Sequence, residues 1–379
     1  MPLSLPSYQV LRVKVQSDND RKVMNQLMES GKYDFWDFPR DVMVHVSEIE
    51  EFDRTLNENK ITYDMWINDV QALVDGQFRR RKDHDRYARL AEEPAVHEFD
   101  YSVYHRYSEL DQWIKDTVGK YPDLTEEFVI GRSYENRVIR VLKIGNKTSE
   151  DKEGIWLQSG IHAREWIAPA TNIWMANAFL EEFKDGSAND TTSILNKYDI
   201  YVLPSVNPDG YEYTWDEYRL WRKTRSPNLG SDCVGTDPNR NWAYGFGGPG
   251  TSSDPCSLIY TGPYIHSEIE VRNIVNFFTK TTKTRFVYFN DIHSYSQLHL
   301  NPWGYQYTHP KDFEDHVNIA SGIGLDWGYG GAGIKYSHSL ELRDKGNYGF
   351  LLPEDQIIPT AEETFVGMKA AFMYMMNNP

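Results

Sequence analysis

The chain has 379 residues, of which 40% are hydrophobic and 14% aromatic, so it can bury a large core and is long enough for two domains. Its formal net charge of -16 argues against a nucleic-acid partner, because phosphate binding requires lysine and arginine clustered on one face. No hydrophobic window approaches the roughly 20 residues that span a bilayer, so we expect a globular protein outside the membrane.

Residues 8 to about 77 show the alternation of a small α+β unit. Strands are predicted at 8–15, 33–38, 42–46 and 63–67, and helices at 21–29 and 48–59. This β-α-β-β-α-β order predicts a ferredoxin-like open sandwich. Over the unit as a whole, acidic residues outnumber basic ones.

A basic run follows this unit and precedes the turn-prone sequence Glu92-Glu93-Pro94. It contains Arg79-Arg80-Arg81-Lys82, Arg86 and Arg89. Such a run is typical of a solvated helix face. In an exposed connector it also offers cleavage sites to a trypsin-like protease, and Arg81, Arg86 and Arg89 are the candidates.

From about residue 99 onward, apolar strands alternate with helical stretches. Strands are predicted at 128–130, 138–144, 155–157, 201–203 and 286–289, and helices at 168–183 and 268–278. The last helix is predicted to begin at Thr360, because Thr360-Ala361-Glu362-Glu363 has the pattern of a capping box. The alternation predicts an α/β domain with a mixed, mostly parallel sheet and helices on both faces.

Two cysteines, Cys233 and Cys256, flank a segment rich in Gly, Pro, Asn and Ser. Two buried free thiols are one interpretation. We favour a disulfide, since closing such a loop removes about 3 kcal/mol of unfolded-state entropy, and a disulfide predicts an oxidising, extracellular compartment. The sequons at Asn146 and Asn189 fit that compartment. Residues 1–6 lack the segments of a signal peptide, so either a signal has been removed or the chain is not secreted.

The pattern His162-Ala163-Arg164-Glu165 follows an apolar run and Gly160. A histidine and a glutamate three residues apart in a turn can point the same way and hold a metal, although the pattern alone is more often a surface ion pair. A second predicted strand, 286–289, leads into His293, and open α/β sheets place their sites at the carboxyl ends of strands. His162, Glu165 and His293 therefore predict a zinc site with a fourth position open for water.

Five motifs occur in one order along the chain: GIHAREW at 160–166, LWRKTR at 220–225, DPNRNW at 237–242, HSYSQ at 293–297 and ELRD at 341–344. Together they resemble the zinc metallocarboxypeptidases of the carboxypeptidase A type. The resemblance covers nearly the whole chain. It implies an activation domain at residues 8–90, with a basic connecting helix at its end, and a catalytic domain at residues 99–379.

The resemblance assigns one Zn²⁺ per chain to His162, Glu165 and His293. It implies that Asp237 accepts the free N–H of His162 and so fixes the tautomer of the ring. The alternative role for Asp237 is a turn cap.

Glu341 resembles the general base and acid of the family, and a desolvated strand position should raise its pKa. The alternative is a strand glutamate paired with Arg343. Arg222 resembles the cation that stabilises the tetrahedral oxyanion. We expect Lys223 and Arg225 to be surface or structural charges.

The resemblance also implies the residues that bind substrate. Asn239 and Arg240 match the pair that binds a terminal carboxylate, for which a planar guanidinium is suited. The other matching positions are Arg164, Ser294, Tyr295, Leu300, Gly304, Leu325 and Phe350. Leu325 stands where members specific for basic residues carry an acid, so we expect a preference for aliphatic or aromatic C-terminal residues.

Between His293 and Glu341 the chain runs about twenty-five residues short of the family pattern, with the join near Ala320-Ser321. The missing piece includes the mobile tyrosine that closes over substrate. Three interpretations follow: the full protein is longer than this sequence, its pocket is open on one side, or its fold is impaired.

We therefore expect a secreted, monomeric zymogen that is activated by a trypsin-like protease and acts on peptide C-termini. Its acidic N-terminal domain is expected to cover the cationic pocket and inhibit it. The alternative is a catalytically impaired, shortened variant that binds peptide C-termini without hydrolysis.

Overall fold

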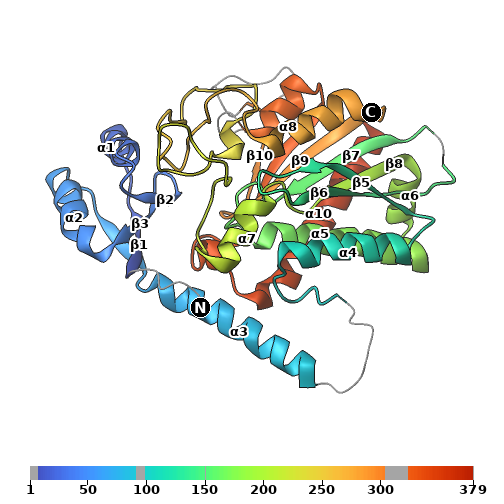
Figure 1. The fold of residues 1–379 in the computed structure, drawn as a ribbon, viewed down its shortest axis with the longest axis horizontal. Coiled ribbons are helices and arrows are strands. Elements are labelled where there is room, and N and C mark those ends of the chain that lie inside the picture. Colours follow the sequence, from blue (N-terminus) through green and yellow to red (C-terminus); the bar gives the residue numbers. More distant parts are fainter. Residues whose placement is uncertain (1–6, 91–98, 150, 304–322, 379) are drawn as a thin grey trace.

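The computed structural model describes residues 7–90, 99–149, 151–303 and 323–378, with the backbone alone for residues 81–90. The described chain contains two sheets, one of four strands near the N-terminus and one of seven strands (Figure 1). We call residues 7–80 the N-terminal module and residues 99–378 the large unit.

The N-terminal module has the predicted β-α-β-β-α-β order. Its strands pair antiparallel in the order β2-β3-β1-β4 and are β1 (Tyr8–Val13), β2 (Asp34–Asp37), β3 (Asp41–His45) and β4 (Tyr63–Ile67). The helices are α1 (Asp18–Glu29) and α2 (Ile49–Glu58). Helix α1 begins with a capping box in which Ser17 and Asp20 bond each other's backbone N–H.

The two faces of the small sheet pack against different partners, because successive strand residues point to opposite sides. Leu11 and Val42 face α1 and α2, which lie on the side away from the large unit (Figure 1). Val10, Trp36 and Met43 instead pack against the large unit, in one cluster with Leu220, Tyr295, Phe350 and Leu351. Both faces of the sheet are therefore covered.

Helix α3 (Val70–Leu90) leaves the small sheet along the large unit (Figure 1). Its first turns are anchored by buried Val70 and Val74, and the Gln77 amide donates to the Leu352 carbonyl at 3.0 Å. The helical backbone continues through the predicted basic connector.

The large sheet has the order β10-β11-β9-β7-β8-β6-β5. Its strands are β5 (Thr125–Arg132), β6 (Val138–Ile144), β7 (Glu153–Ser159), β8 (Tyr198–Leu203), β9 (Phe286–Ser294), β10 (Leu298–Leu300) and β11 (Tyr336–Leu342). Strands β11, β9, β7 and β8 run parallel, while β10, β6 and β5 are antiparallel to their neighbours. The mixed sheet is confirmed, with its parallel part at the centre.

Helices cover both faces of the large sheet, as predicted (Figure 1). One face carries α4 (Tyr107–Lys120), α5 (Ile167–Asp185) and α10 (Ile357–Asn377), and the other carries α8 (Ile269–Asn276). The other α-helices in the described part of the chain are α6 (Asn189–Lys197), α7 (Pro208–Asp216) and the short α9 (Gly324–Asp326). In β7, Ile155 and Leu157 face the first group of helices and Trp156 faces α8.

The start of the last helix was predicted wrongly. Helix α10 begins at Ile357, and Thr360 lies inside it, donating its hydroxyl to the Gln356 carbonyl at 2.6 Å. Pro359 is tolerated in the first turn of the helix, because an N–H at this position would have no partner within the helix. Buried Ile357 anchors this first turn. The Thr-Glu pattern therefore does not cap the helix.

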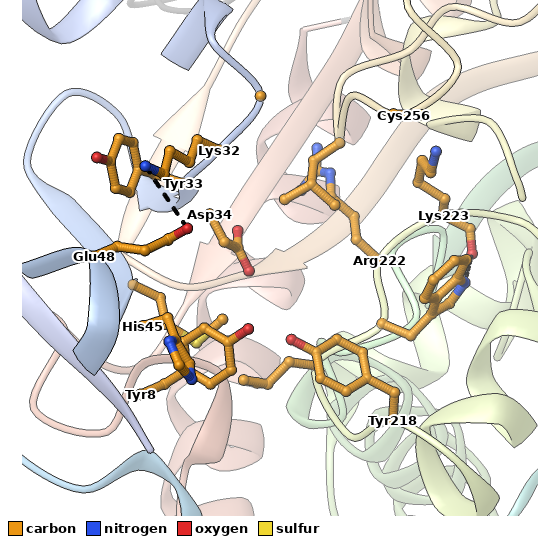
Figure 2. Close-up of a pocket in the computed structure, with 15 residues that line it drawn as sticks. Tyr8, Lys32, Tyr33, Asp34, His45, Glu48, Tyr218, Arg222, Lys223 and Cys256 are labelled. Carbon is orange, nitrogen blue, oxygen red and sulfur yellow. Dashed lines mark hydrogen bonds and ion pairs between the residues drawn. The ribbon is translucent and has the colours of Figure 1, made fainter. Parts of the chain in front are cut away.

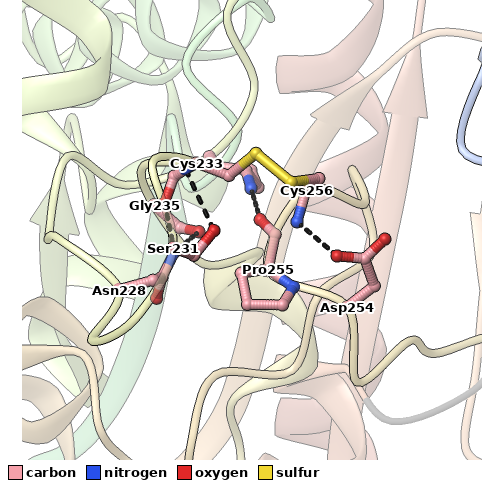
Figure 3. Close-up of a disulfide and its surroundings, with 8 residues drawn as sticks. Asn228, Ser231, Cys233, Gly235, Asp254, Pro255 and Cys256 are labelled. Atoms are coloured by element: carbon pink, nitrogen blue, oxygen red, sulfur yellow. Dashed lines mark hydrogen bonds between the residues drawn. A yellow bond between two sulfur atoms is a disulfide. The ribbon is translucent and has the colours of Figure 1, made fainter.

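The predicted disulfide between Cys233 and Cys256 is present and closes a loop with a sequence separation of 23 residues. Figure 3 shows the Asn228 amide beside Cys233 and Gly235, whose carbonyls it bonds at 3.0 Å each. No helix in the described part of the chain is long and apolar enough to cross a membrane.

Candidate zinc site and substrate cleft

Two neighbouring parallel strands bring the predicted metal ligands together. Strand β7 ends at Ser159, opposite Ile292 of β9, so the turn that carries His162 lies beside His293. Gly160 has a φ of 62°, a left-handed backbone conformation that is strained for a residue with a side chain. The glycine therefore lets the chain turn sharply out of the sheet. The site therefore lies at the carboxyl ends of central strands.

His162, Glu165 and His293 point their ligand atoms at one another. Glu165 Oε1 lies 2.8 Å from His162 Nδ1, and Oε2 lies 2.9 Å from His293 Nδ1. The three ligand atoms lie within 4.8 Å of one another and the residues are buried. Burial opposes ionisation of Glu165, but the two imidazoles outweigh it and lower its pKa. Two nitrogens and one carboxylate are the donors of a catalytic zinc site, so the residues fit this metal.

Asp237 contacts both the metal ligand and the oxyanion candidate. Its Oδ1 lies 3.1 Å from His162 Nε2 and also accepts the Asn239 N–H at 2.9 Å, so the two roles considered for Asp237 occur together. Its Oδ2 accepts a hydrogen bond from Arg222 Nη2 at 2.8 Å. Burial would raise the pKa of Asp237, but Arg222 and His162 hold it well below its usual range.

Glu341 lies beside His293, because the parallel register of β11 and β9 pairs these two residues. Burial and the carboxylate of Glu165 raise the pKa of Glu341 to about 8, against the opposing effects of His293 and Arg222. Arg343 instead bonds Glu363 at 2.6 and 2.8 Å. The structure therefore does not contain the alternative pair between Glu341 and Arg343.

Arg240 and Asn239 lie in a short turn, Pro238–Arg240, next to the ligands. Arg240 donates to the carbonyls of Gly250 at 3.0 Å and Asn239 at 2.9 Å. No carboxylate among the described residues forms an ion pair with Arg240. The Asn239 side-chain oxygen accepts the Gly324 N–H at 2.8 Å, which connects this turn to α9.

Leu300, Ile323 and Leu325 form a small apolar cluster of their own. Leu325 is fully buried, and the neighbouring Ser337 hydroxyl donates to its carbonyl at 2.6 Å. Gly304, also predicted for this pocket, lies outside the described residues.

The N-terminal module covers the other predicted substrate residues. Arg164 is 1% exposed and its Nη1 donates to Asp34 Oδ2 at 2.6 Å. The Tyr295 hydroxyl donates to Asp41 at 2.9 Å, and Phe350 packs against Trp36 with ring centroids 5.2 Å apart. The buried Ser294 lies closer to the metal site, its N–H 3.4 Å from Glu165.

A cleft of about 480 Å³ remains between the N-terminal module and the large unit. Figure 2 shows Tyr8, Asp34 and Glu48 on one side and Tyr218 and Arg222 on the other. Lys223 also lines the cleft, but its ammonium is held by the Pro255 carbonyl at 2.7 Å, and burial lowers its pKa to about 8. Lys223 is therefore a structural charge.

Three carboxylates that contact predicted site residues, Asp34, Asp41 and Asp291, were not predicted from the sequence. Asp34 reaches Arg164 from a different sheet, and no local pattern indicates this. Asp291 lies 3.2 Å from His293 Nε2. The sequence did contain a signal for Asp291, because an acid two residues before a histidine on a strand lies on the same face as that histidine.

The comparisons with known proteins agree with this geometry. The zinc carboxypeptidase family model matches residues 110–325 and 314–367, and the carboxypeptidase activation peptide model matches residues 11–77. Carboxypeptidase A2 of Mus musculus is 39% identical over 406 residues, covering 98% of this chain and 94% of the mouse protein. Carboxypeptidase A1 of Sus scrofa is 38% identical over 407 residues, with the same coverage of 98% and 94%.

Solved structures share the fold of this chain. Thrombin activatable fibrinolysis inhibitor superposes with a TM-score of 0.84 at 32% identity, covering 98% of this chain and 100% of that chain. Carboxypeptidase A from Helicoverpa armigera has a TM-score of 0.82 at 23% identity and 97% coverage of both chains, which supports the fold.

The sequence alignments also bear on the short segment. They run over 406 and 407 positions, whereas the chain has 379 residues, so these relatives carry residues with no counterpart here. The family model breaks into two pieces that overlap at residues 314–325, a range that includes the last part of the undescribed stretch 304–322. The chain belongs to the zinc carboxypeptidase family and is a metallocarboxypeptidase that carries an activation peptide domain.

Proposed function

We propose that this metallocarboxypeptidase removes aliphatic or aromatic C-terminal residues from peptides once its N-terminal module has been cleaved away. The observation that carries the proposal is the position of Arg240 in the turn next to the metal ligands. Among the described residues, the hydrogen-bond partners of its guanidinium are backbone carbonyls. Such a guanidinium can bind a terminal carboxylate at little cost, because it breaks no ion pair to do so.

Each residue of the site has a place in hydrolysis. Arg240 and Asn239 hold the terminal carboxylate, and the apolar cluster at Leu325 receives the last side chain, where a lysine or arginine cation would lack a partner. Bound zinc supplies a Lewis acid that polarises the scissile carbonyl and acidifies water. Glu341 takes the proton from that water and returns it to the leaving amine. Arg222, oriented by Asp237, holds the negative charge that forms on the carbonyl oxygen.

The N-terminal module inhibits by occupying the residues that would bind the rest of the peptide. Asp34, Trp36 and Asp41 already contact Arg164, Phe350 and Tyr295. A longer peptide cannot displace these contacts without undocking the module. Cleavage in the basic part of α3, at Arg81, Arg86 or Arg89, separates the module from the large unit.

Hydrolysis of a furylacryloyl dipeptide ending in Phe tests the proposal, measured before and after trypsin and with a zinc chelator. We expect activity that depends on zinc and falls strongly when the last residue is Lys. Activity that persists in chelator, or cleavage of internal bonds only, would refute it. Saturable peptide binding with zinc present but no turnover would instead support the impaired variant, which the retained Glu341 and Arg222 do not favour.

The disulfide supports secretion, because Cys233–Cys256 requires an oxidising compartment. We extend the proposal to a secreted monomer. Expression in a secretory host and sizing of the medium test this extension, and an intracellular reduced protein or a stable dimer would contradict it.

A further inference from the structure

Asp291 lies inside the large unit, two residues before His293 on the central strand β9. Residues two apart on a strand share a face, so both side chains point to the face that holds the metal ligands. Asp291 is 1% exposed, and β9 lies between β7 and β11 in the sheet. A carboxylate in such a position is costly unless it has a compensating partner.

His293 is the one described residue at ion-pairing distance from Asp291, with Nε2 3.2 Å from Oδ2. Neither carboxylate oxygen has a hydrogen-bond partner among the described residues, so the ion-pair contact with His293 is the compensation that the structure shows for Asp291. Asp237, at the opposite histidine, differs in this respect, because Arg222 and the Asn239 N–H share its charge. The charge of Asp291 is therefore directed at one imidazole.

The hydrogen-bonding roles around His293 leave Asp291 as the acceptor. Nδ1 of His293 faces Glu165, so Nε2 carries the proton when Nδ1 is a ligand. The amide nitrogen of Asn239 lies 3.3 Å from Nε2 and can donate to it when Nε2 is unprotonated, but it offers no acceptor to a protonated Nε2. Its orientation is fixed, because the Asn239 oxygen accepts the Gly324 N–H. Two donors cannot pair, and the nearby acceptor is Asp291 Oδ2.

Space around Asp291 is limited by the same turn. A Cβ on Gly324 would lie 3.0 Å from Asp291 Oδ2 and 3.4 Å from Trp242 Cε2. The glycine therefore leaves just enough room for the carboxylate to face His293. This confinement keeps the carboxylate within 3.2 Å of His293 Nε2.

We propose that Asp291 is a positioning residue that holds His293 in the metal-binding tautomer, as the second carboxylate–histidine pair of a site in which Asp237 and His162 form the first. The inference rests on the proposed zinc site. No other described residue pairs with the Asp291 carboxylate, so its negative charge acts on His293 alone. It makes the imidazole a stronger metal ligand and favours a divalent cation next to it.

Zinc affinity of the full chain tests the inference, measured by competition with a chromogenic chelator. We expect Asp291→Ala to raise the zinc Kd by about 10–100-fold. Asp291→Asn should have a smaller effect, because its amide oxygen can still accept the proton of Nε2 while the charge is lost. The matched control is Asp209→Asn, a buried carboxylate that is held by Ser133 and Arg137 outside the metal site and should leave the Kd unchanged.

A structural role alone would lower the melting temperature without this change in Kd. Zinc binding by Asp291→Ala within twofold of the parent would overturn the inference and leave the zinc site standing. If that variant does not fold, Asp291→Asn decides, together with the His293 N–H resonance in ¹⁵N-histidine-labelled, zinc-loaded protein, which should move upfield. An unchanged Kd and resonance in Asp291→Asn would also overturn it. A parent chain that binds no zinc would overturn the proposed site itself.

Discussion

Asp34 of the N-terminal module accepts a hydrogen bond from Arg164 of the large unit at 2.6 Å, in a pair whose arginine side chain is 1% exposed. The Arg164 Nε has no hydrogen-bond partner among the described residues, so Asp34 is the carboxylate that compensates this buried cation. Arg164 also lies 4.0 Å from the Phe350 ring centroid. The module thus places an acidic group where the proposed function requires a peptide substrate.

Replacing Asp34 by Asn should weaken the docking of the module. Removing one partner of a buried, hydrogen-bonded charge pair costs about 2–5 kcal/mol, so we expect uncleaved Asp34→Asn to hydrolyse a peptide substrate at least about tenfold faster than the uncleaved parent. The two proteins should have equal rates after trypsin. Asp64→Asn is the control, because Asp64 forms an exposed pair with Lys14 inside the module. Equal rates before cleavage would contradict the inhibitory role.

Glu341→Gln should abolish proton transfer while leaving the metal in place. General base catalysis contributes about 10²–10⁴-fold, so we expect kcat to fall by that factor with little change in zinc affinity. Glu363→Gln serves as control, since Glu363 holds Arg343 at the surface and should leave kcat unchanged. A kcat within threefold of the parent in Glu341→Gln would exclude Glu341 as the base.

The metal ligands could be predicted because each lies just after an apolar strand or within its last residues. His162 and His293 follow from strand patterns and a short motif, and the register of β7 and β9 then brings them together. The β-α-β-β-α-β order of the N-terminal module could also be predicted, because short apolar strands and helical stretches follow one another along its sequence. Local sequence patterns thus predict the strands, and the parallel pairing of β7 and β9 places the ligands side by side.

Contacts between distant segments could not be predicted in this way. Asp34 and Arg164 are 130 positions apart, and only the docking of two sheets brings them together. The predicted start of α10 was wrong, because the helix already begins at buried Ile357 and Thr360 lies inside it. Asp291 lies just before the motif that begins at His293, so the resemblance did not assign it a role.

Leu325→Asp should shift the preference for the C-terminal residue. An acid at the base of the pocket would pair with Lys or Arg, and a hydrogen bond to a charged group contributes about 1.5–3 kcal/mol, or roughly 10–100-fold in the ratio of kcat/KM for Lys over Phe substrates. Leu325→Met, which preserves the apolar lining, should retain the original preference. An unchanged ratio in Leu325→Asp would show that Leu325 does not contact the side chain.

Glu270 should make the stability of the large unit depend on pH. It is fully buried at the start of α8, where its Oε1 accepts the Tyr134 N–H at 3.0 Å and its Oε2 has no hydrogen-bond partner among the described residues. Burial is the main reason that its pKa is raised from 4.5 to about 7, and the carboxylates of Glu268 and Asp209 add to it.

The folded chain holds this proton more tightly than the unfolded chain, so the contribution is complete below pH 4.5 and is lost as pH rises through about 7. Glu270→Gln cannot ionise. The parent should therefore lose on the order of 3 kcal/mol relative to Glu270→Gln between pH 4.5 and 8, measured by urea unfolding at each pH. Glu126→Gln, at an exposed position, should show no such trend. A constant difference between the parent and Glu270→Gln across this range would mean that Glu270 ionises as readily in the folded chain as in the unfolded one.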